Sequence, residues 1–416
     1  MDYSEVRNNL RNAIQERMDY GKDYSDGEVD ELIDEMMQSR EEMSLCPVEI
    51  RWRLKRELFN ALRGLDILQD LVDDSTVSEI MVNGTDPIFV EQSGCLRELE
   101  LRFESAEKLQ DVIQKIVAGC NRMVNEASPI VDASLSNGSR VNIVMRPIAL
   151  NGPIVTIRRF PDHPITMAQL VRMDSISGEA ADFLQKLVQA GYNLFISGGT
   201  GSGKTTFLNA LSGFISPGER VITIEDSAEL QLQGIPNLVR LETRNGNVEG
   251  CREISIRDLI RASLRMRPDR IIVGEVRGAE AFDMMQCLNT GHDGSMSTGH
   301  ANSATDMLSR LENMVLMGMD LPLAAIRQQI ASGLDVIVHL GRLRDKSRRV
   351  LEITEVTGYA EGRIGLNPLY VFEEQGEDAK GRILGKLQRK GALVCERKLR
   401  AAGLSQIPVE GEGTCA

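Results

Sequence analysis

This chain of 416 residues has few aromatic side chains, an odd number of cysteines and no long apolar run. Aromatic residues make up 4% of the sequence, so aliphatic and methionine side chains must fill its cores. Its 7 cysteines include no C-x-x-C pair, so neither a zinc ribbon nor a disulfide framework is indicated. No apolar stretch approaches the roughly 20 residues that span a bilayer. The polar, acidic N-terminus lacks a signal-peptide pattern. We therefore expect a cytoplasmic protein, peripheral to any membrane at which it acts.

Basic residues are also in deficit, with 48 Lys and Arg against 61 Asp and Glu and a formal net charge of −13. Proteins that coat nucleic acid rely on an excess of Lys and Arg to contact phosphates, so we expect no nucleic-acid partner. The segment from Lys380 to Arg400 is an exception, because most of its charged residues are basic. This segment is a candidate contact for a membrane protein or anionic lipid, and a solvated tail is the alternative.

The hydrophobic period divides the chain into five parts. The first part has helical spacing, and the second alternates short strands with one helix at about 106–123, as a small α+β domain does. Pro161 and Pro164 interrupt both periods and mark a linker. We predict a helical N-terminal region at 1–70, an α+β domain at 71–160 and this linker at 161–168. A larger domain follows at 169–360, and a C-terminal extension at 361–416.

In the larger domain, apolar runs typical of buried strands alternate with helical patterns. This alternation predicts an α/β fold with a parallel sheet between helices and with ligands at the carboxyl ends of the strands. The expected strands are at 193–197, 220–224, 270–273, 295–298 and 335–339.

A phosphate-loop motif, G-x-x-x-x-G-K-[ST], follows the first of these strands and precedes a helix. Its backbone N–H groups and the positive end of the helix are suited to a polyphosphate. Lys204 is expected to neutralise phosphate charge, and the Thr205 hydroxyl to hold Mg²⁺. The predicted nucleotide-binding residues are Gly198, Gly199, Thr200, Gly201, Ser202, Gly203, Lys204, Thr205 and Thr206.

Hydrolysis also requires a carboxylate that orients and deprotonates a water molecule. Glu275 follows the apolar run 270–273, and Glu225 follows the run 221–224. Either one alone could be an ordinary solvated residue at a strand end. Two such carboxylates downstream of one phosphate loop favour a catalytic pair.

Other polar candidates are histidines and arginines. His292 and His300 are separated by only seven residues in a glycine-rich segment, where a hydrogen-bonding sensor of phosphate is more plausible than a zinc site. Arginines of the α+β domain could bridge the oxygens of a transferring phosphoryl group if that domain folds over the phosphate loop. Arg140 and Arg158 are the preferred candidates, with ordinary exposed strand arginines as the alternative.

Four segments in this order resemble the type II/IV secretion ATPases, and most closely the subfamily that powers Tad/Flp-type pili. They are the phosphate loop, an acidic box at 224–230, the segment 264–278 and a histidine box ending at 298–303.

The resemblance implies a homo-hexameric ring of two-domain subunits, each holding ATP between an N-terminal domain and a RecA-like motor domain. It also implies that Glu275 acts at the second nucleotide motif, that Glu225 helps to position water or magnesium, and that His300 senses the γ-phosphate. Arg140 and Arg158 match nucleotide-contacting arginines, within a subunit or across the ring. The expected partner is an integral membrane platform protein.

Two other functions remain open at this stage. A DNA-transfer ATPase would share the motor fold but needs a basic channel. A nucleotide-binding assembly scaffold would not need Lys204, Glu225 and Glu275 together. A GTPase is disfavoured because the sequence has no N-K-x-D motif.

Overall fold

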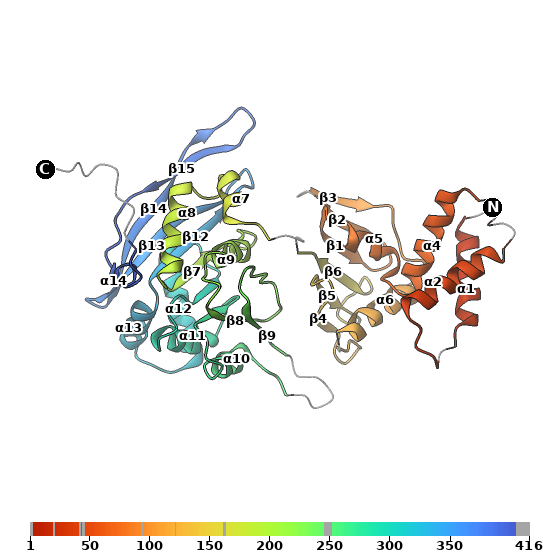
Figure 1. The fold of residues 1–416 in the computed structure, drawn as a ribbon, viewed down its shortest axis with the longest axis horizontal. Helices are drawn as coiled ribbons and strands as arrows, with labels where there is room; N and C mark the ends of the chain where they lie inside the picture. Colours follow the sequence, from red (N-terminus) through yellow and green to blue (C-terminus); the bar gives the residue numbers. More distant parts are fainter. Residues whose placement is uncertain are drawn as a thin grey trace. The chain divides into compact units, whose positions relative to one another are not determined.

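The computed structural model describes residues 3–19, 21–40, 43, 46–92, 95–120, 122–160, 164–244 and 252–404. The chain forms two compact units, Met1–Asp162 and His163–Ala416 (Figure 1). Of the predicted linker at 161–168, residues 161–163 lie outside the described residues. The five-part division of the sequence stays a prediction.

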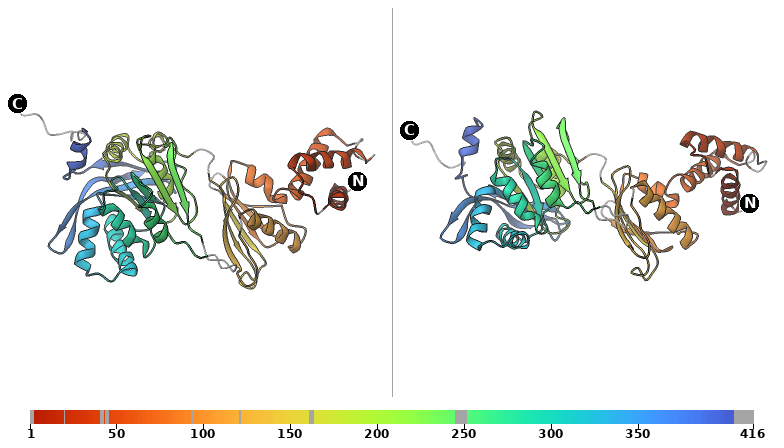
Figure 2. Two further views of the ribbon diagram at one scale, coloured as in Figure 1. Left: turned by 60° about the horizontal axis from the view of Figure 1, so that its bottom comes forward. Right: turned by 90° about the horizontal axis from the view of Figure 1, so that it is seen from below.

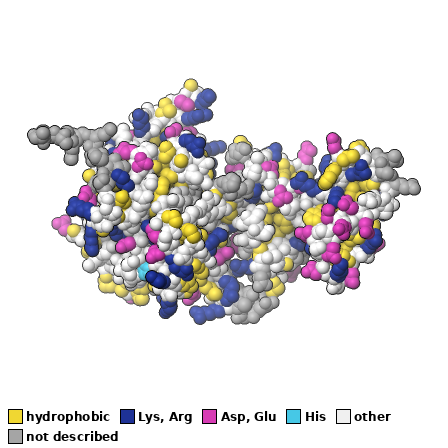
Figure 3. All heavy atoms as spheres, in the orientation of Figure 1, with side chains coloured by type: hydrophobic (Ala, Val, Ile, Leu, Met, Phe, Trp, Pro, Cys, Tyr) yellow, Lys and Arg dark blue, Asp and Glu magenta, His cyan; other side chains and the backbone are white. Residues whose placement is uncertain are grey.

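The first unit begins with a small helical bundle. Its apolar core includes Leu10, Ile14, Ile33 and Leu58, all buried at helical spacing. Acidic and basic side chains are interspersed over these helices on the face shown in Figure 3. The helices are α1 (Tyr3–Arg17), α2 (Asp26–Gln38) and α4 (Val48–Leu62), followed by the short η1 (Asp66–Leu68) and α5 (Gln69–Asp73).

A six-stranded antiparallel sheet completes the first unit, in the order β3-β2-β1-β6-β5-β4. One face is apolar and packs against α6 (Ala106–Gly119), whose own buried stripe includes Leu109, Ile113 and Ile116 (Figure 2). The other face carries polar residues, among them Arg140 and Arg158. The strands are β1 (Val77–Asn83), β2 (Ile88–Gln92), β3 (Cys95–Leu99), β4 (Ile130–Ser134), β5 (Arg140–Val144) and β6 (Ile154–Arg158).

The second unit contains a nine-stranded sheet in the order β15-β14-β13-β12-β7-β11-β10-β8-β9. The six strands from β12 to β9 in this order are parallel, and β13, β14 and β15 add antiparallel neighbours. The strands are β7 (Leu194–Gly198), β8 (Arg220–Glu225), β9 (Asn237–Glu242), β10 (Arg270–Val273), β11 (Met296–Gly299), β12 (Val336–Arg342), β13 (Arg348–Ala360), β14 (Arg363–Glu377) and β15 (Ile383–Arg389).

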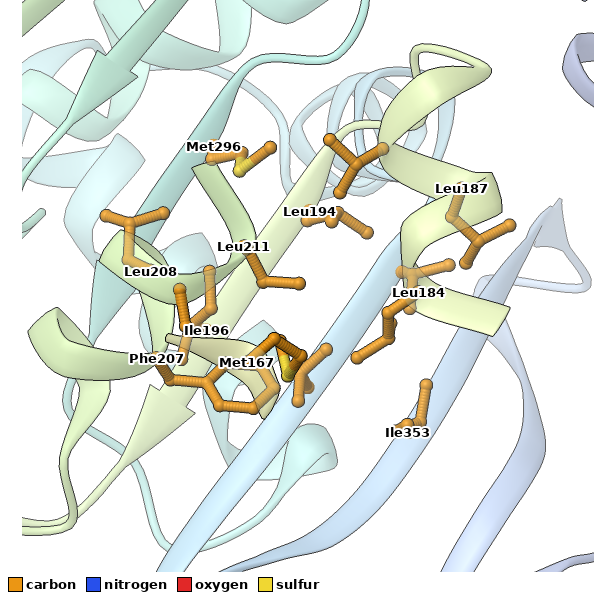
Figure 4. Close-up of a cluster of buried hydrophobic side chains, with 14 of the residues drawn as sticks. Met167, Leu184, Leu187, Leu194, Ile196, Phe207, Leu208, Leu211, Met296 and Ile353 are labelled. Carbon is orange, nitrogen blue, oxygen red and sulfur yellow. The ribbon is translucent and has the colours of Figure 1, made fainter. Parts of the chain in front are cut away.

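Helices cover both faces of this sheet. On one face, side chains of α7, α8 and α9 meet those of β7, β11 and β13, as Figure 4 shows for Leu184, Ile196 and Phe207. On the other face, α10 to α13 form a second core. The helices are α7 (Met167–Arg172), α8 (Gly178–Gln189), α9 (Lys204–Ser212), α10 (Ile256–Ser263), α11 (Glu280–Asn289), α12 (Ala304–Gly318), α13 (Leu323–Gly333) and α14 (Arg397–Ala401).

The predicted α/β class is confirmed. All five expected strands of the larger domain are present and adjacent in the parallel part of the sheet. The strands β3, β4, β9 and β13 to β15 were not predicted from the sequence. Within the described part of the chain, no helix is both long enough and apolar enough to cross a membrane.

Candidate functional site

The strand order brings the sequence motifs to one edge of the sheet. Strands β7, β11, β10 and β8 are consecutive parallel neighbours, so their carboxyl ends lie in a row. The phosphate loop follows β7, His300 follows β11, Glu275 follows β10, and Glu225 ends β8. Ligands of such sheets bind at this edge, so the row is the candidate site.

The phosphate loop has the backbone conformation that its glycines predict. Gly201 and Gly203 have φ angles of 70° and 92°, in the left-handed region that glycine adopts most readily. Gly203 is the N-cap of α9, so Lys204 and Thr205 occupy its first turn. Ser202 is buried, and its hydroxyl donates a 2.9 Å hydrogen bond to the carbonyl of Gly199. The loop is thus fixed from within.

The Lys204 side chain is buried, with 8% of its surface exposed. Its Nζ donates to the carbonyls of Gly198 and Gly199 at 3.2 and 3.1 Å. Nζ also lies 3.3 Å from Nδ1 of His300. Burial lowers the pKa of Lys204, and the negative charge of Glu275 acts in the opposite direction. A desolvated cation beside the loop is suited to neutralise an anionic ligand.

Glu275 lies between His300 and an arginine that the sequence analysis had not assigned. Its Oε2 accepts a 2.6 Å hydrogen bond from Nη2 of Arg277. His300 Nε2 lies 2.8 Å from Glu275 Oε1, but no described group donates an aligned hydrogen bond to that buried oxygen. Burial lowers the pKa of His300, which favours its neutral form. Glu275 Oε1 therefore keeps the capacity to accept a proton or a hydrogen bond from a ligand.

Glu225 is held more tightly than Glu275. Its side chain is 4% exposed, and Oε1 accepts hydrogen bonds from the backbone N–H groups of Glu229 and Leu230, each at 2.9 Å. A β-carbon on Gly274 would lie 2.9 Å from Glu225 Cγ, so glycine is needed there. Burial raises the pKa of Glu225 to about 7. In this structure Glu225 orders the segment 226–230 as well as facing the candidate site.

Replacing Glu225 with Gln is expected to remove a pH dependence of stability. The unfolded carboxyl titrates near 4.5 and the folded one near 7, so between these values only the folded protein keeps the proton. Wild-type stability therefore falls as pH rises from 4.5 to 7. Relative to wild type, Glu225→Gln should gain ~3 kcal/mol in unfolding free energy across this window, since one pKa unit is worth about 1.4 kcal/mol.

Urea unfolding of both proteins at several pH values measures this difference. Gln keeps an oxygen acceptor for the N–H groups of Glu229 and Leu230, so the backbone contacts can persist in the variant. Parallel stability curves for wild type and variant would contradict a raised pKa for Glu225.

The oxygen groups around Thr205 fit a hard divalent cation. Thr205 Oγ1 lies 3.4 Å from Glu229 Oε2. Hydroxyl and carboxylate oxygens are the ligands that Mg²⁺ prefers. The acidic box was noted in the sequence, but its Glu229 was not singled out, because only the turn after β8 directs that residue to α9.

Arg140 and Arg158 are direct cross-strand neighbours on β5 and β6. They share the polar face of the first unit's sheet, opposite the face covered by α6. The structure therefore pairs the two predicted arginines with each other. Their proposed contact with nucleotide stays a prediction.

Two further basic residues contact the site: Arg348 contacts the phosphate loop, and Arg277 contacts the Glu275 carboxylate. Arg348 Nε, at the start of β13, donates a 2.8 Å hydrogen bond to the carbonyl of Gly201. Arg277 pairs with Glu275, and this hydrogen bond raises the pKa of the guanidinium. No sequence signal identifies Arg348, because 147 positions separate it from Gly201. Arg277 was recognisable from its place two residues after Glu275.

The other polar candidates are engaged elsewhere. His292 precedes β11 and approaches the carbonyl of Cys287 at 3.3 Å, so it lies at the opposite strand end from His300. In the basic C-terminal segment, Lys390 pairs with Glu373, Lys398 with Asp293 and Asp335, and Arg400 with Glu396. These pairs give part of that segment a structural role.

Comparison with known proteins agrees with this geometry. Residues 61–397 match the family model described as "Type II/IV secretion system protein". The chain is 36% identical over 315 residues to a putative conjugal transfer protein of Mycobacterium tuberculosis, covering 74% of this chain and 89% of the relative. It is 33% identical to the type IV secretion system protein PtlH of Bordetella pertussis, covering 70% and 93%.

Among solved structures, the ATPase DotB of Legionella pneumophila is similar, with a TM-score of 0.51 and 20% identity over 70% of this chain and 79% of that one. This likeness supports the predicted RecA-like P-loop fold. The family model spans most of the chain, and the relatives are matched over most of their length. The chain is therefore a member of the type II/IV secretion system protein family.

Proposed function

We propose that this chain hydrolyses ATP at the carboxyl edge of its nine-stranded sheet and is the motor of a secretion or pilus machine. The observation that carries the proposal is the contact series Arg277, Glu275, His300 and Lys204 beside the phosphate loop. His300 lies between the Glu275 carboxylate and the Lys204 ammonium group, so a candidate base and a candidate phosphate ligand are linked through one imidazole.

Each residue of this series has a distinct role. The loop N–H groups and Lys204 bind the β- and γ-phosphates. Glu275 accepts the proton of the attacking water, and Arg277 fixes the orientation of its carboxylate. Neutral His300 contacts both Lys204 and Glu275, so it can report the presence of the γ-phosphate to the carboxylate.

Magnesium fits the oxygens near Thr205, with Thr205 and Glu229 as its nearest protein groups. When bound, the cation supplies positive charge to the phosphate oxygens. Glu225 supports this site indirectly, because it holds the backbone of Glu229. Arg140 and Arg158 add a second source of positive charge if the first unit closes over the nucleotide.

The proposal extends to a homo-hexameric ring that works on an integral membrane platform protein of a Tad/Flp-type pilus. This finer assignment rests on the motif resemblance of the sequence. A DNA-transfer motor is the alternative, favoured by the name of the mycobacterial relative and opposed by the net charge of −13.

ATP turnover by the purified full-length chain tests the proposal. We expect magnesium-dependent release of phosphate from ATP, stimulated by vesicles of anionic lipid or by membrane extract and little affected by DNA. Light scattering with and without ATP tests the ring. Strong stimulation by single- or double-stranded DNA alone would favour the conjugation motor, and ATP binding without turnover would favour a scaffold.

A further inference from the structure

His339 is a buried histidine beside the site, and the mechanism above gives it no role. It lies on β12, directly opposite Ser197 of β7, the residue that precedes the phosphate loop. Only 6% of its surface is exposed. Its Nδ1 lies 2.8 Å from the hydroxyl oxygen of Ser197, in a contact that is itself buried.

The backbone of Asn302 is also close enough to this imidazole to raise its pKa, against the lowering by burial. Because Ser197 engages Nδ1, Nε2 is the ring nitrogen that can donate to this backbone group. Asn302 is two residues beyond His300, in the short segment between β11 and α12. His339 thus connects the root of the phosphate loop to the segment that carries His300.

The packing around this connection leaves little room for adjustment. A β-carbon on Gly198 would lie 2.5 Å from the carbonyl oxygen of Leu340, the residue after His339. A β-carbon on Gly299 would lie 2.9 Å from Phe195 and 3.0 Å from Met307. The neighbouring strands β11 and β12 are therefore in tight contact with β7. A side chain that links β12 to the segment after β11 fixes the register of these strands relative to each other.

The protonation of His339 suits a link of this kind. Burial lowers its pKa, which favours the neutral ring. A neutral imidazole has one N–H and one lone pair, so it can donate to the Asn302 carbonyl and accept from the Ser197 hydroxyl. Both hydrogen bonds are then satisfied without a buried charge.

We propose that His339 is a positioning residue that holds the His300 segment in register with the phosphate loop through Asn302 and Ser197. This inference rests on the proposed function, because its effect is on ATP hydrolysis. Lys204 and the loop N–H groups remain in place without His339, so nucleotide binding should persist. Turnover should fall, because His300 would no longer be held against Lys204 and Glu275.

Three substitutions separate the two hydrogen bonds. Asn places its amide near the position of Nδ1 and retains the Ser197 contact, Gln reaches toward Nε2 and retains the Asn302 contact, and Leu retains neither. We expect kcat to fall roughly 10- to 100-fold in His339→Leu, as for other small misplacements of catalytic groups. We expect His339→Gln to recover most of this loss and His339→Asn little of it. The affinity for ATP should change less than about 3-fold.

A double-mutant cycle gives the decisive measurement. If His339 acts through His300, adding His339→Leu to His300→Ala should lower kcat no further. His292→Gln, at the opposite end of β11, is the matched control and should leave kcat unchanged. Thermal unfolding of each full-length variant checks the fold, and the Gln and Asn variants keep the test available if the Leu variant does not fold.

Three outcomes would overturn the inference. In the first, the losses from His300→Ala and His339→Leu multiply. In the second, ATP affinity falls in parallel with kcat, which indicates a general structural role. In the third, all three variants at residue 339 turn over ATP like the wild type. A wild-type chain that cannot hydrolyse ATP overturns the proposed function as well, so the two failures are distinguishable.

Discussion

Lys204→Ala should lose both nucleotide binding and ATP turnover. Lys204 Nζ is the buried cation of the phosphate loop, held against the carbonyls of Gly198 and Gly199 and next to His300. A charge-assisted hydrogen bond is worth roughly 1.5–3 kcal/mol, and a triphosphate can accept more than one from an ammonium group. We therefore expect ATP affinity to fall at least about 100-fold, measured by titration calorimetry, with turnover below detection.

Lys380→Ala is a matched control for charge. Lys380 is an exposed lysine in the turn between β14 and β15, far along the sheet order from the phosphate loop. Its removal changes the net charge equally and should leave binding and turnover unaltered. If Lys204→Ala still turned over ATP, the phosphate loop would have no place in the mechanism.

Glu275→Gln should separate binding from hydrolysis. The amide keeps the size of the side chain and an oxygen for Arg277, but it cannot accept a proton from water. General-base catalysis contributes roughly 10²- to 10⁴-fold, so kcat should fall by that factor while ATP affinity stays within about 3-fold. Single-turnover phosphate release measures the chemical step directly.

Glu374→Gln is the corresponding control, because Glu374 also pairs with an arginine, Arg344, but on the antiparallel side of the sheet. It should hydrolyse ATP at the wild-type rate. Normal hydrolysis by Glu275→Gln would move the catalytic role to another carboxylate, and Glu229, beside Thr205, is then the next residue to test.

The strands that the sequence predicted and those that it missed differ in their burial. β7 and β10 are buried at every position and contain apolar runs, whereas β11 is equally buried but contains Ser and Thr. β3 and β9 are edge strands with several exposed or half-buried residues, and their sequences mix charges with apolar residues. An edge strand has one neighbour and little need for apolar patterning, so its pairing is decided by the sheet it joins.

The residues of the candidate site also fall into those that the sequence identified and those that it did not. The phosphate loop, Glu275 and Glu225 were identifiable because each follows an apolar run, and His300 because it belongs to a local glycine-rich motif. Glu229, Arg348 and His339 were not assigned a role, because their partners are distant in the sequence or depend on the path of a turn. The structure also showed that Glu225 uses one oxygen to hold the backbone of its own loop.

The sequence by itself determined the α/β class, the phosphate loop and the polar residues that end the central strands, because all of these depend on periodicity and on neighbouring residues. Only the tertiary structure decided which of these residues touch. Strand order places β11 between β7 and β10, and this order alone brings His300 between Lys204 and Glu275. Contacts across strands depend on how the sheet is assembled, and no local pattern in the chain encodes that order.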